Sequence, residues 1–344
     1  MIDLRSDTVT KPTPPMWEAM KKSPLGDDVL GDDTTVIKLE HKIAEMLGHE
    51  AGCFVPSGTM ANQIAIHFHT EPGDELILHK DTHVFHYESG APAAISGVSM
   101  NFVTGKNGLF NSNDIKNAIR PEDNHYARSK MVIVENTHNR GGGKVWPISL
   151  CEEVVNCSIE NKLVTHLDGA RLFNASVASN TKLNNFGSIF QSVSVCFSKG
   201  LGCPVGSALV SSKKNIKEAK RIRKRLGGTM RQSGLLAGAA LWALENNINR
   251  LEDDHKRAKQ IAIACESIDG LSVDIESIDT NIVFINLDSK KCSSKECCNY
   301  LKELGILVLP LGSNAIRAVT HLGIDDKNID NTIRAFQKIP SIYK

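Results

Sequence analysis

The strongest constraint on the fold is a regular alternation of short apolar strands with helices through the middle of the chain. Strands are predicted over residues 75–79, 130–135, 163–167, 192–197 and 206–211. Helical patterns lie between them over residues 57–69, 149–161 and 215–226. Such alternation is typical of a doubly wound α/β domain with a largely parallel sheet, whose ligands bind beyond the carboxyl ends of the strands. His138, Asp168 and Lys199 all follow predicted strand ends, which predicts a site there.

The chain on either side of this region has other patterns. Residues 1–25 are expected to be irregular, because their four prolines break any long element. Residues 34–48 are predicted as a helix, and 234–267 as one long, bent helical stretch. Strands at 280–287, 306–309 and 316–320 alternate with helices at 293–304 and 325–338, which indicates a small α+β unit. We therefore expect an N-terminal segment (1–25), a large domain (26–250) and a small C-terminal domain (251–344).

The composition excludes several classes of protein. Lys+Arg is 40 and Asp+Glu is 39, and this balance argues against a general nucleic-acid binder. No apolar run is long enough to span a membrane, and the polar N-terminus does not resemble a signal peptide. The nine cysteines contain no C-x-x-C pair, which favours reduced thiols in a cytoplasmic protein. A basic run over 213–225 could bind RNA, but such runs are usually solvated helix faces.

A lysine followed by glycines carries the first chemical signal. Lys199 comes directly after an apolar strand, and Gly200 and Gly202 let another group approach closely. Burial at a strand end favours the neutral, nucleophilic amine of a lysine. The alternative reading is an ordinary exposed loop lysine.

An acid and an arginine end the preceding strand. Asp168 and Arg171 alone would be read as a structural ion pair. Taken with Lys199, they fit a pyridoxal phosphate site, in which the lysine forms the Schiff base and the carboxylate keeps the pyridine nitrogen protonated. Ser57-Gly58-Thr59 at a helix start fits an anion cradle for the phosphate, although it also fits a helix cap without ligand.

Three histidines lie at spacings of four and three residues. His79, His83 and His86 could suggest a metal site, but no carboxylate or cysteine pattern supports one, and the stretch is expected to be a loop. We therefore predict no metal. A flat imidazole stacked on a cofactor ring is the better interpretation of His83.

Seven segments, taken in order, resemble the low-specificity L-threonine aldolases, which are pyridoxal phosphate enzymes of the aspartate aminotransferase fold type. The segments are Asp3-Leu4-Arg5-Ser6-Asp7-Thr8-Val9-Thr10, Gly26-Asp27-Asp28-Val29, Phe54-Val55-Pro56-Ser57-Gly58-Thr59-Met60, Glu135-Asn136-Thr137-His138-Asn139, Asp168-Gly169-Ala170-Arg171-Leu172-Phe173-Asn174-Ala175, Ser198-Lys199-Gly200-Leu201 and Gly227-Gly228-Thr229-Met230-Arg231-Gln232. The resemblance runs almost end to end. It implies a mostly parallel seven-stranded sheet covered by helices, with a smaller C-terminal α+β domain.

The resemblance also implies roles for individual residues. Lys199 matches the Schiff-base lysine, Asp168 the partner of the pyridine nitrogen, His83 the stacked imidazole, and Gly58 and Thr59 the phosphate-binding turn. The groups that match the grip on the substrate carboxylate are Ser6, Arg171 and Arg317. The residues that match basic groups reaching a phosphate across a subunit interface are Arg231 and Lys224. His125 matches a histidine near the substrate hydroxyl.

Two positions depart from the family pattern. Thr229 stands where a third glycine is common, and His86 stands where a bulkier side chain is expected. The second departure concerns the preference for the substrate side chain at the β-carbon.

The implied activity is cleavage of L-threonine or L-allo-threonine to glycine and acetaldehyde, in a homo-oligomer with a dimer as catalytic unit and a tetramer as assembly. The general base stays open among His83, His125 and a bound water. Another pyridoxal phosphate lyase, of the β-elimination type, is one alternative, and a metal-dependent or non-enzymatic protein is the other. For Arg231, the alternative is an ion pair with an acid of its own chain.

Overall fold

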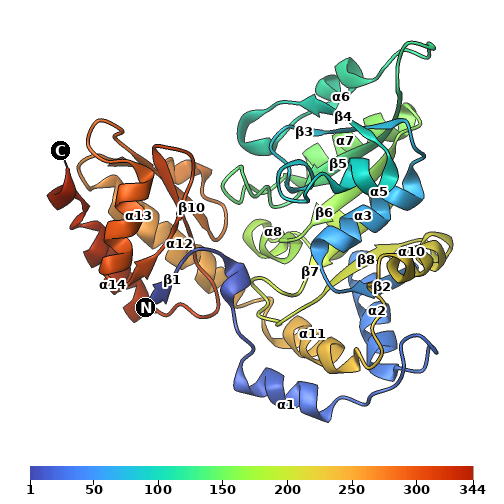
Figure 1. Cartoon of the computed structure of the whole chain (residues 1–344), viewed down its shortest axis with the longest axis horizontal. Helices are drawn as coiled ribbons and strands as arrows, with labels where there is room; N and C mark the ends of the chain where they lie inside the picture. Colours follow the sequence, from blue (N-terminus) through green and yellow to red (C-terminus); the bar gives the residue numbers. More distant parts are fainter. Residues whose placement is uncertain (344) are drawn as a thin grey trace.

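A seven-stranded sheet forms the centre of the larger part of the molecule, in a computed structural model that describes residues 1–343 (Figure 1). The strand order is β2-β8-β7-β6-β5-β3-β4, and β8 alone runs against its neighbours. The strands are β2 (Ala51–Val55), β3 (Asp74–His79), β4 (Ser99–Val103), β5 (Arg128–Glu135), β6 (Val164–Gly169), β7 (Ser192–Cys196) and β8 (Ser207–Ser211). The predicted α/β fold class with a mostly parallel sheet is confirmed.

Helices cover both faces of this sheet, because alternate residues of the buried strands point to opposite sides. Leu76 and Leu78 of β3 pack under the face that carries α3, whereas Ile77 packs on the other face. The helices of the first face are α3 (Gly58–His69), α4 (His83–His86), α5 (Ala91–Ser96) and α10 (Lys213–Arg225). Those of the second are α2 (Thr34–Leu47), α6 (Ser112–Ala118), α7 (Ile148–Glu160), α8 (Leu172–Ser179), α9 (Leu183–Gly187) and α11 (Gly234–Asn246).

The smaller part of the molecule has its own core around a four-stranded antiparallel sheet of order β12-β13-β10-β9. Its strands are β9 (Leu271–Ser272), β10 (Ile282–Leu287), β12 (Leu309–Pro310) and β13 (Ala315–Val319), and its helices are α12 (Leu251–Glu266), α13 (Ser294–Glu303) and α14 (Asp326–Phe336). The N-terminal strand β1 (Ile2–Asp3) pairs in parallel with β11 (Ile306–Leu307), so the chain begins in this part (Figure 1). The domain boundaries at 25 and 250 stay predictions, and residue 344 lies outside the described residues.

Four expectations from the sequence are wrong in detail. Residues 1–25 are not irregular throughout, because α1 (Pro14–Lys22) begins with two prolines at positions where a helix needs no N–H donor. The stretch 234–267 is two helices, α11 and α12, and Asn247 between them donates to the carbonyl of Leu201 (2.7 Å). The strand predicted at 306–309 is divided between two sheets. The loop expected at 79–86 contains the short helix α4.

Two further findings concern membrane-spanning helices and disulfides, which the sequence argues against. Within residues 1–343, no helix is long and apolar enough to cross a bilayer. None of the nine cysteines forms a disulfide, and eight of them are buried.

Candidate active site

The carboxyl ends of three parallel strands bring the predicted residues to one edge of the sheet. Glu135 at the end of β5 lies beside Asp168 near the end of β6, and Asp168 lies beside Ser194 of β7. Lys199 follows β7 by three residues. The convergence expected from the strand pattern therefore occurs for Asp168 and Lys199.

Asp168 is a buried carboxylate held by neutral donors. It is 2% exposed and accepts hydrogen bonds from the Asn62 side-chain amide (2.8 Å) and the Ala170 backbone N–H (3.1 Å). The orientation of Asn62 is fixed in turn, because its amide oxygen accepts from Ser194 (2.7 Å) and contacts His166 Nε2 (3.1 Å). Within the described chain, no lysine or arginine pairs with Asp168. A buried anion without a cationic partner favours binding of a cation.

His83 lies on α4 with its backbone and its ring fixed by two different acids. Its backbone N–H donates to Glu135 (2.6 Å), and its Nδ1 lies 2.9 Å from Glu88 Oε1. Burial opposes the charged imidazolium, but the hydrogen bond that His83 donates to Glu88 and the charge of Asp168 outweigh it and raise the pKa of His83. The structure thus holds this ring in a defined orientation beside Asp168.

Arg171 forms a buried, two-pronged ion pair with Asp7. Its Nε and Nη2 donate to the two carboxylate oxygens of Asp7, each at 2.7 Å. Burial would raise the pKa of Asp7, but the charge of Arg171 and its hydrogen bonds hold that pKa well below its ordinary value. This geometry is the strong, bidentate form of an arginine–carboxylate contact.

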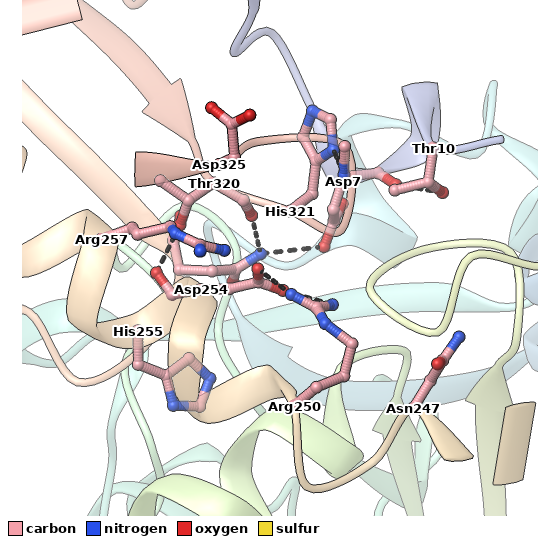
Figure 2. A network of polar contacts seen from close by, with 12 residues as sticks. Asp7, Thr10, Asn247, Arg250, Asp254, His255, Arg257, Thr320, His321 and Asp325 are labelled. Carbon is pink, nitrogen blue, oxygen red and sulfur yellow. Dashed lines mark hydrogen bonds and ion pairs between the residues drawn. The ribbon is translucent and has the colours of Figure 1, made fainter. Parts of the chain in front are cut away.

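The same carboxylate links the two parts of the molecule (Figure 2). Asn281 donates to Asp7 (3.2 Å) and to the carbonyl of Thr320 (3.0 Å), and the Thr320 hydroxyl donates to the carbonyl of Asp254 on α12 (2.6 Å). Asp7 therefore connects Arg171, which lies between β6 and α8, with the strands and helix of the smaller part.

Arg317 on β13 is a largely buried cation that lacks a carboxylate. Its Nε is buried without a hydrogen-bond partner, and no acid among residues 1–343 pairs with it. Burial and the nearby charge of Arg171 lower the pKa of Arg317 to about 10. Ser6 lies next to Asp7 in the chain, and its hydroxyl accepts from the backbone N–H of Thr8 (3.2 Å). An unpaired guanidinium in this setting suits a carboxylate ligand.

Lys199 is half-buried between these groups. Its carbonyl accepts from the Thr10 hydroxyl (3.0 Å), but no described residue pairs with its ammonium group. The charge of Lys199 acts on both Asp7 and His83. The loop thus holds the backbone of Lys199 while leaving its amine available.

The amino end of α3 lies near the same sheet edge. Ser57 caps the helix by accepting from Met60 N–H (3.2 Å). A Cβ atom at Gly58 would lie 2.7 Å from Cys196 Sγ, so this first helical residue has to be glycine. Helix amino ends attract phosphate groups, and Gly58 and Thr59 offer their backbone N–H groups here.

Three predicted residues lie elsewhere in this chain. His125 is 88% exposed, contacts Asp123 (2.6 Å) and precedes β5, at the amino end of an eight-residue strand. At 3.3 Å per residue, that strand separates His125 from the edge with Asp168 by roughly 26 Å. Arg231 is 64% exposed and forms an ion pair with Asp27 of its own chain (2.9 Å), which is the alternative arrangement for this residue. Lys224 is exposed in the last turn of α10.

The remaining histidines have local contacts. His138 is buried and packs edge-on against His79, with 5.1 Å between ring centres. His79 Nε2 lies 3.2 Å from the carbonyl of Gly105, and His86 lies 3.5 Å from Asp81. His79, His83 and His86 do not converge. Among residues 1–343, only His83, Glu88 and Asp168 bring three metal-type ligand atoms within 4.8 Å of one another.

Sequence reasoning missed four residues that fix this site. Asn62 lies one helical turn after Gly58, so the spacing could have placed it near the ligand. Asp7 stands inside a segment used for the resemblance, but it received no role. Glu88 and Asn281 carry no signal in the sequence, because their partners become neighbours only in the fold.

The comparisons with known proteins agree with this geometry. A model of the β-eliminating lyase family matches residues 3–289. A probable low-specificity L-threonine aldolase 2 of Arabidopsis thaliana is 42% identical over 98% of this chain and 97% of the relative. The low specificity L-threonine aldolase of Escherichia coli K12 is 40% identical over 96% of each chain. The chain belongs to the low-specificity L-threonine aldolase family.

The fold of the threonine aldolase family agrees as well. The structure of Leishmania major threonine aldolase covers 99% of this chain and 100% of its own, with a TM-score of 0.86 at 20% identity. The family resemblance inferred from the seven sequence segments is therefore confirmed.

Proposed function

We propose that this protein cleaves L-threonine and L-allo-threonine to glycine and acetaldehyde. The observation that carries the proposal is a set of three charges held at one site, each without an ion-pair partner in the described chain. They are the Asp168 carboxylate, the Lys199 ammonium and the Arg317 guanidinium. Asp168 complements a pyridinium nitrogen and Arg317 a substrate carboxylate, whereas Lys199, once it has lost its proton, offers a nucleophilic amine to an aldehyde carbon.

Pyridoxal phosphate is the cofactor of this enzyme, and the residues present fit it. Asp168 would hold the pyridine nitrogen, Lys199 the aldehyde carbon, and the amino end of α3 with Gly58 and Thr59 the phosphate. Arg171 lines the same site with its guanidinium fixed by Asp7. When bound, the cofactor supplies an electron sink for the charge left at Cα as the Cα–Cβ bond breaks.

The substrate is oriented by the cationic side of the site. Arg317 binds the substrate carboxylate, and Arg171 and Ser6 complete the grip. Fixing this carboxylate sets the direction of the Cα–Cβ bond, which is a positioning effect on the rate. Proton removal from the β-hydroxyl falls to His83 or to a water that it holds.

The second part of the proposal concerns the assembly, a cytoplasmic homo-oligomer with a dimer as catalytic unit and a tetramer as the complete form. His125, Lys224 and Arg231 are exposed, so a neighbouring copy can reach them. We expect Arg231 and Lys224 to bind the phosphate in a neighbour's site, and His125 to lie near a neighbour's substrate hydroxyl.

Mixing two inactive variants tests the shared site. Chains with Arg231→Ala and chains with Lys199→Ala are refolded together, and mixed dimers should regain part of the activity, because one of their two sites carries both residues. If mixed dimers form but stay inactive, Arg231 acts only in its own chain through Asp27.

Product analysis tests the reaction itself. The purified protein loaded with pyridoxal phosphate is given L-threonine or L-allo-threonine, and equal amounts of glycine and acetaldehyde are expected. A β-eliminating lyase would instead release a 2-oxo acid and ammonia, and that product would overturn the proposal. The ratio of the two rates also gives the preference at the β-carbon.

A further inference from the structure

Glu88 is a fully buried carboxylate whose three hydrogen-bond donors all belong to the candidate site or its supporting helix. It is 2% exposed and lies between α4 and α5. His83 Nδ1 lies 2.9 Å from Oε1, Asn62 donates to Oε1 (2.9 Å), and Gln63 donates to Oε2 (2.6 Å). No lysine or arginine of the described chain pairs with it. Burial of a carboxylate without a lysine or arginine partner is unfavourable. The hydrogen bonds from His83, Asn62 and Gln63 therefore have to offset the lost hydration.

A second buried acid shares the same support. The Asn62 amide nitrogen donates to both Glu88 (2.9 Å) and Asp168 (2.8 Å). Ligand atoms of Glu88, Asp168 and His83 all lie within 4.8 Å of one another. Two buried carboxylates at this separation repel each other, and a positive charge on the nearby His83 ring, which contacts Glu88, relieves the repulsion.

We propose that Glu88 is a positioning residue that keeps Nδ1 of His83 protonated and orients the ring, so that Nε2 faces the reacting groups. A neutral imidazole that donates from Nδ1 to a carboxylate has its free lone pair on Nε2. Carboxylates that orient a metal-bound histidine act in the same way, and their loss costs about 10–100-fold in activity or affinity. This proposal rests on the proposed function, which places the His83 ring beside the cofactor ring.

The charged and polar groups around His83 determine how readily its ring binds a proton. Glu88 faces Nδ1, Glu135 accepts from the backbone N–H, and the charges of Asp168 and Lys199 both act on the ring. The Tyr87 ring lies 5.5 Å away. Burial and Lys199 disfavour the imidazolium, whereas Glu88 and Asp168 favour it and raise the pKa of His83. Glu88 is the one acid here that contacts the ring itself.

The first measurement is the titration of His83 in the full-length holoenzyme, followed by NMR of isotope-labelled histidine with His83→Gln to assign the signal. In Glu88→Gln, the His83 pKa should fall below the wild-type value, because the carboxylate that stabilises the imidazolium is gone. The matched control is Glu75→Gln, which alters another buried glutamate at the amino end of β3, held by Asn101 and Arg120. This control should leave the His83 titration unchanged.

The second measurement separates positioning from substrate binding. Glu88→Gln should lower kcat for threonine cleavage about 10–100-fold, with a smaller change in KM, because Arg317 and Arg171 still hold the carboxylate. Glu88→Asp keeps the charge with a shorter reach, so its kcat and its His83 pKa should lie between those of the wild type and Glu88→Gln. It also replaces Glu88→Gln if that variant does not fold.

The two measurements distinguish failure of this proposal from failure of the proposed function. An unchanged His83 pKa in Glu88→Gln and Glu88→Asp, or an equal shift in Glu75→Gln, would overturn the role of Glu88 even in an active aldolase. A protein that does not cleave threonine, but in which Glu88→Gln lowers the His83 pKa, would overturn the function and support the Glu88–His83 pair.

Discussion

Two halves of the candidate site differ in charge and in how they are built. The half around Asp168, with Asn62, His83 and Glu88, comes entirely from the larger part of the chain and carries two buried carboxylates. The half around Asp7 combines Arg171, Asn281 and Arg317 from far-separated segments. Its one carboxylate pairs with Arg171 and leaves Arg317 without an acid partner among the described residues. The first half is anionic and the second is cationic.

The difference in charge indicates which ligand group each half can bind. The carboxylates of Asp168 and Glu88 are held by neutral donors and a histidine, without a lysine or arginine partner in the described chain, which favours binding of a cationic ring nitrogen. The Asp7 half keeps one cation unpaired until a carboxylate ligand arrives. Its acid, Asp7, is linked through Asn281 to Thr320, whose hydroxyl bonds to the carbonyl of Asp254 (Asp7, Thr320 and Asp254 are labelled in Figure 2). We therefore expect the first half to determine the rate and the second half to determine substrate affinity.

The largest effect is expected at Lys199, which lies between the two halves. Lys199→Ala should abolish turnover and covalent attachment of the cofactor, because no other described residue offers an amine there. Borohydride reduction of the wild type followed by peptide mapping should place the pyridoxyl label on Lys199. A label on a different lysine would contradict the assignment.

The next effect concerns the anionic half. Asp168→Asn should lower kcat on the order of 10²–10³-fold, because a neutral amide cannot stabilise the positive ring nitrogen as charge develops. The loss should appear in kcat more than in KM. Steady-state kinetics with L-threonine measures both. A near-normal kcat with a raised KM would mean that Asp168 contributes to substrate binding and not to the rate, and would contradict the division of roles between the two halves.

A smaller effect is expected in the cationic half, and it should appear in KM and not in kcat. Arg317→Leu should remove a charged hydrogen bond worth about 1.5–3 kcal/mol and raise KM for threonine roughly 10–150-fold. The control is Arg257→Leu, which breaks an ion pair with Asp326 in the smaller part and should leave KM unchanged. If Arg317→Leu lowers kcat alone, the division between rate and affinity fails.

The sequence predicts the residues at the strand ends better than the contacts that fix them. Asp168 and Lys199 follow buried strands, and the carboxyl ends of parallel strands must meet, so local pattern alone brings them together. The bidentate Asp7–Arg171 pair joins residues 164 positions apart, and no local pattern encodes it. His125 shows the other limit, because it is exposed in this chain and the role proposed for it depends on a neighbouring copy.

The N-terminal helix and the α11–α12 junction show why fold details were missed. The four prolines of residues 1–25 predicted an irregular segment, but Pro14 and Pro15 occupy the first two positions of α1, where they cost no helical hydrogen bond. The break after α11 depends on a tertiary contact, the bond from Asn247 to Leu201, and apolar periodicity does not report such contacts.

The smallest effect is expected from Asp7→Asn, measured as stability rather than activity. The buried ion pair with Arg171 holds the pKa of Asp7 below its unfolded value, near 3.9. Such a carboxylate stabilises the folded state above the unfolded pKa, and this contribution is lost as pH falls toward the folded pKa. At pH 7, Asp7→Asn should therefore cost about 1–3 kcal/mol, through loss of the charge on a hydrogen-bonded acceptor.

The dependence of this cost on pH decides whether the pair or the packing is responsible. The difference in unfolding free energy between wild type and Asp7→Asn should be constant from pH 7 to about pH 5 and shrink below about pH 4, where the unfolded-state carboxyl binds its proton. Asp253→Asn, at an exposed position on α12, is the control and should change stability by no more than about 0.5 kcal/mol. A difference that stays constant down to pH 3 would mean that the shape of Asp7, and not its charge, joins the two parts of the molecule. The cationic half would then be held by packing alone, and its contrast with the anionic half would lose its electrostatic basis.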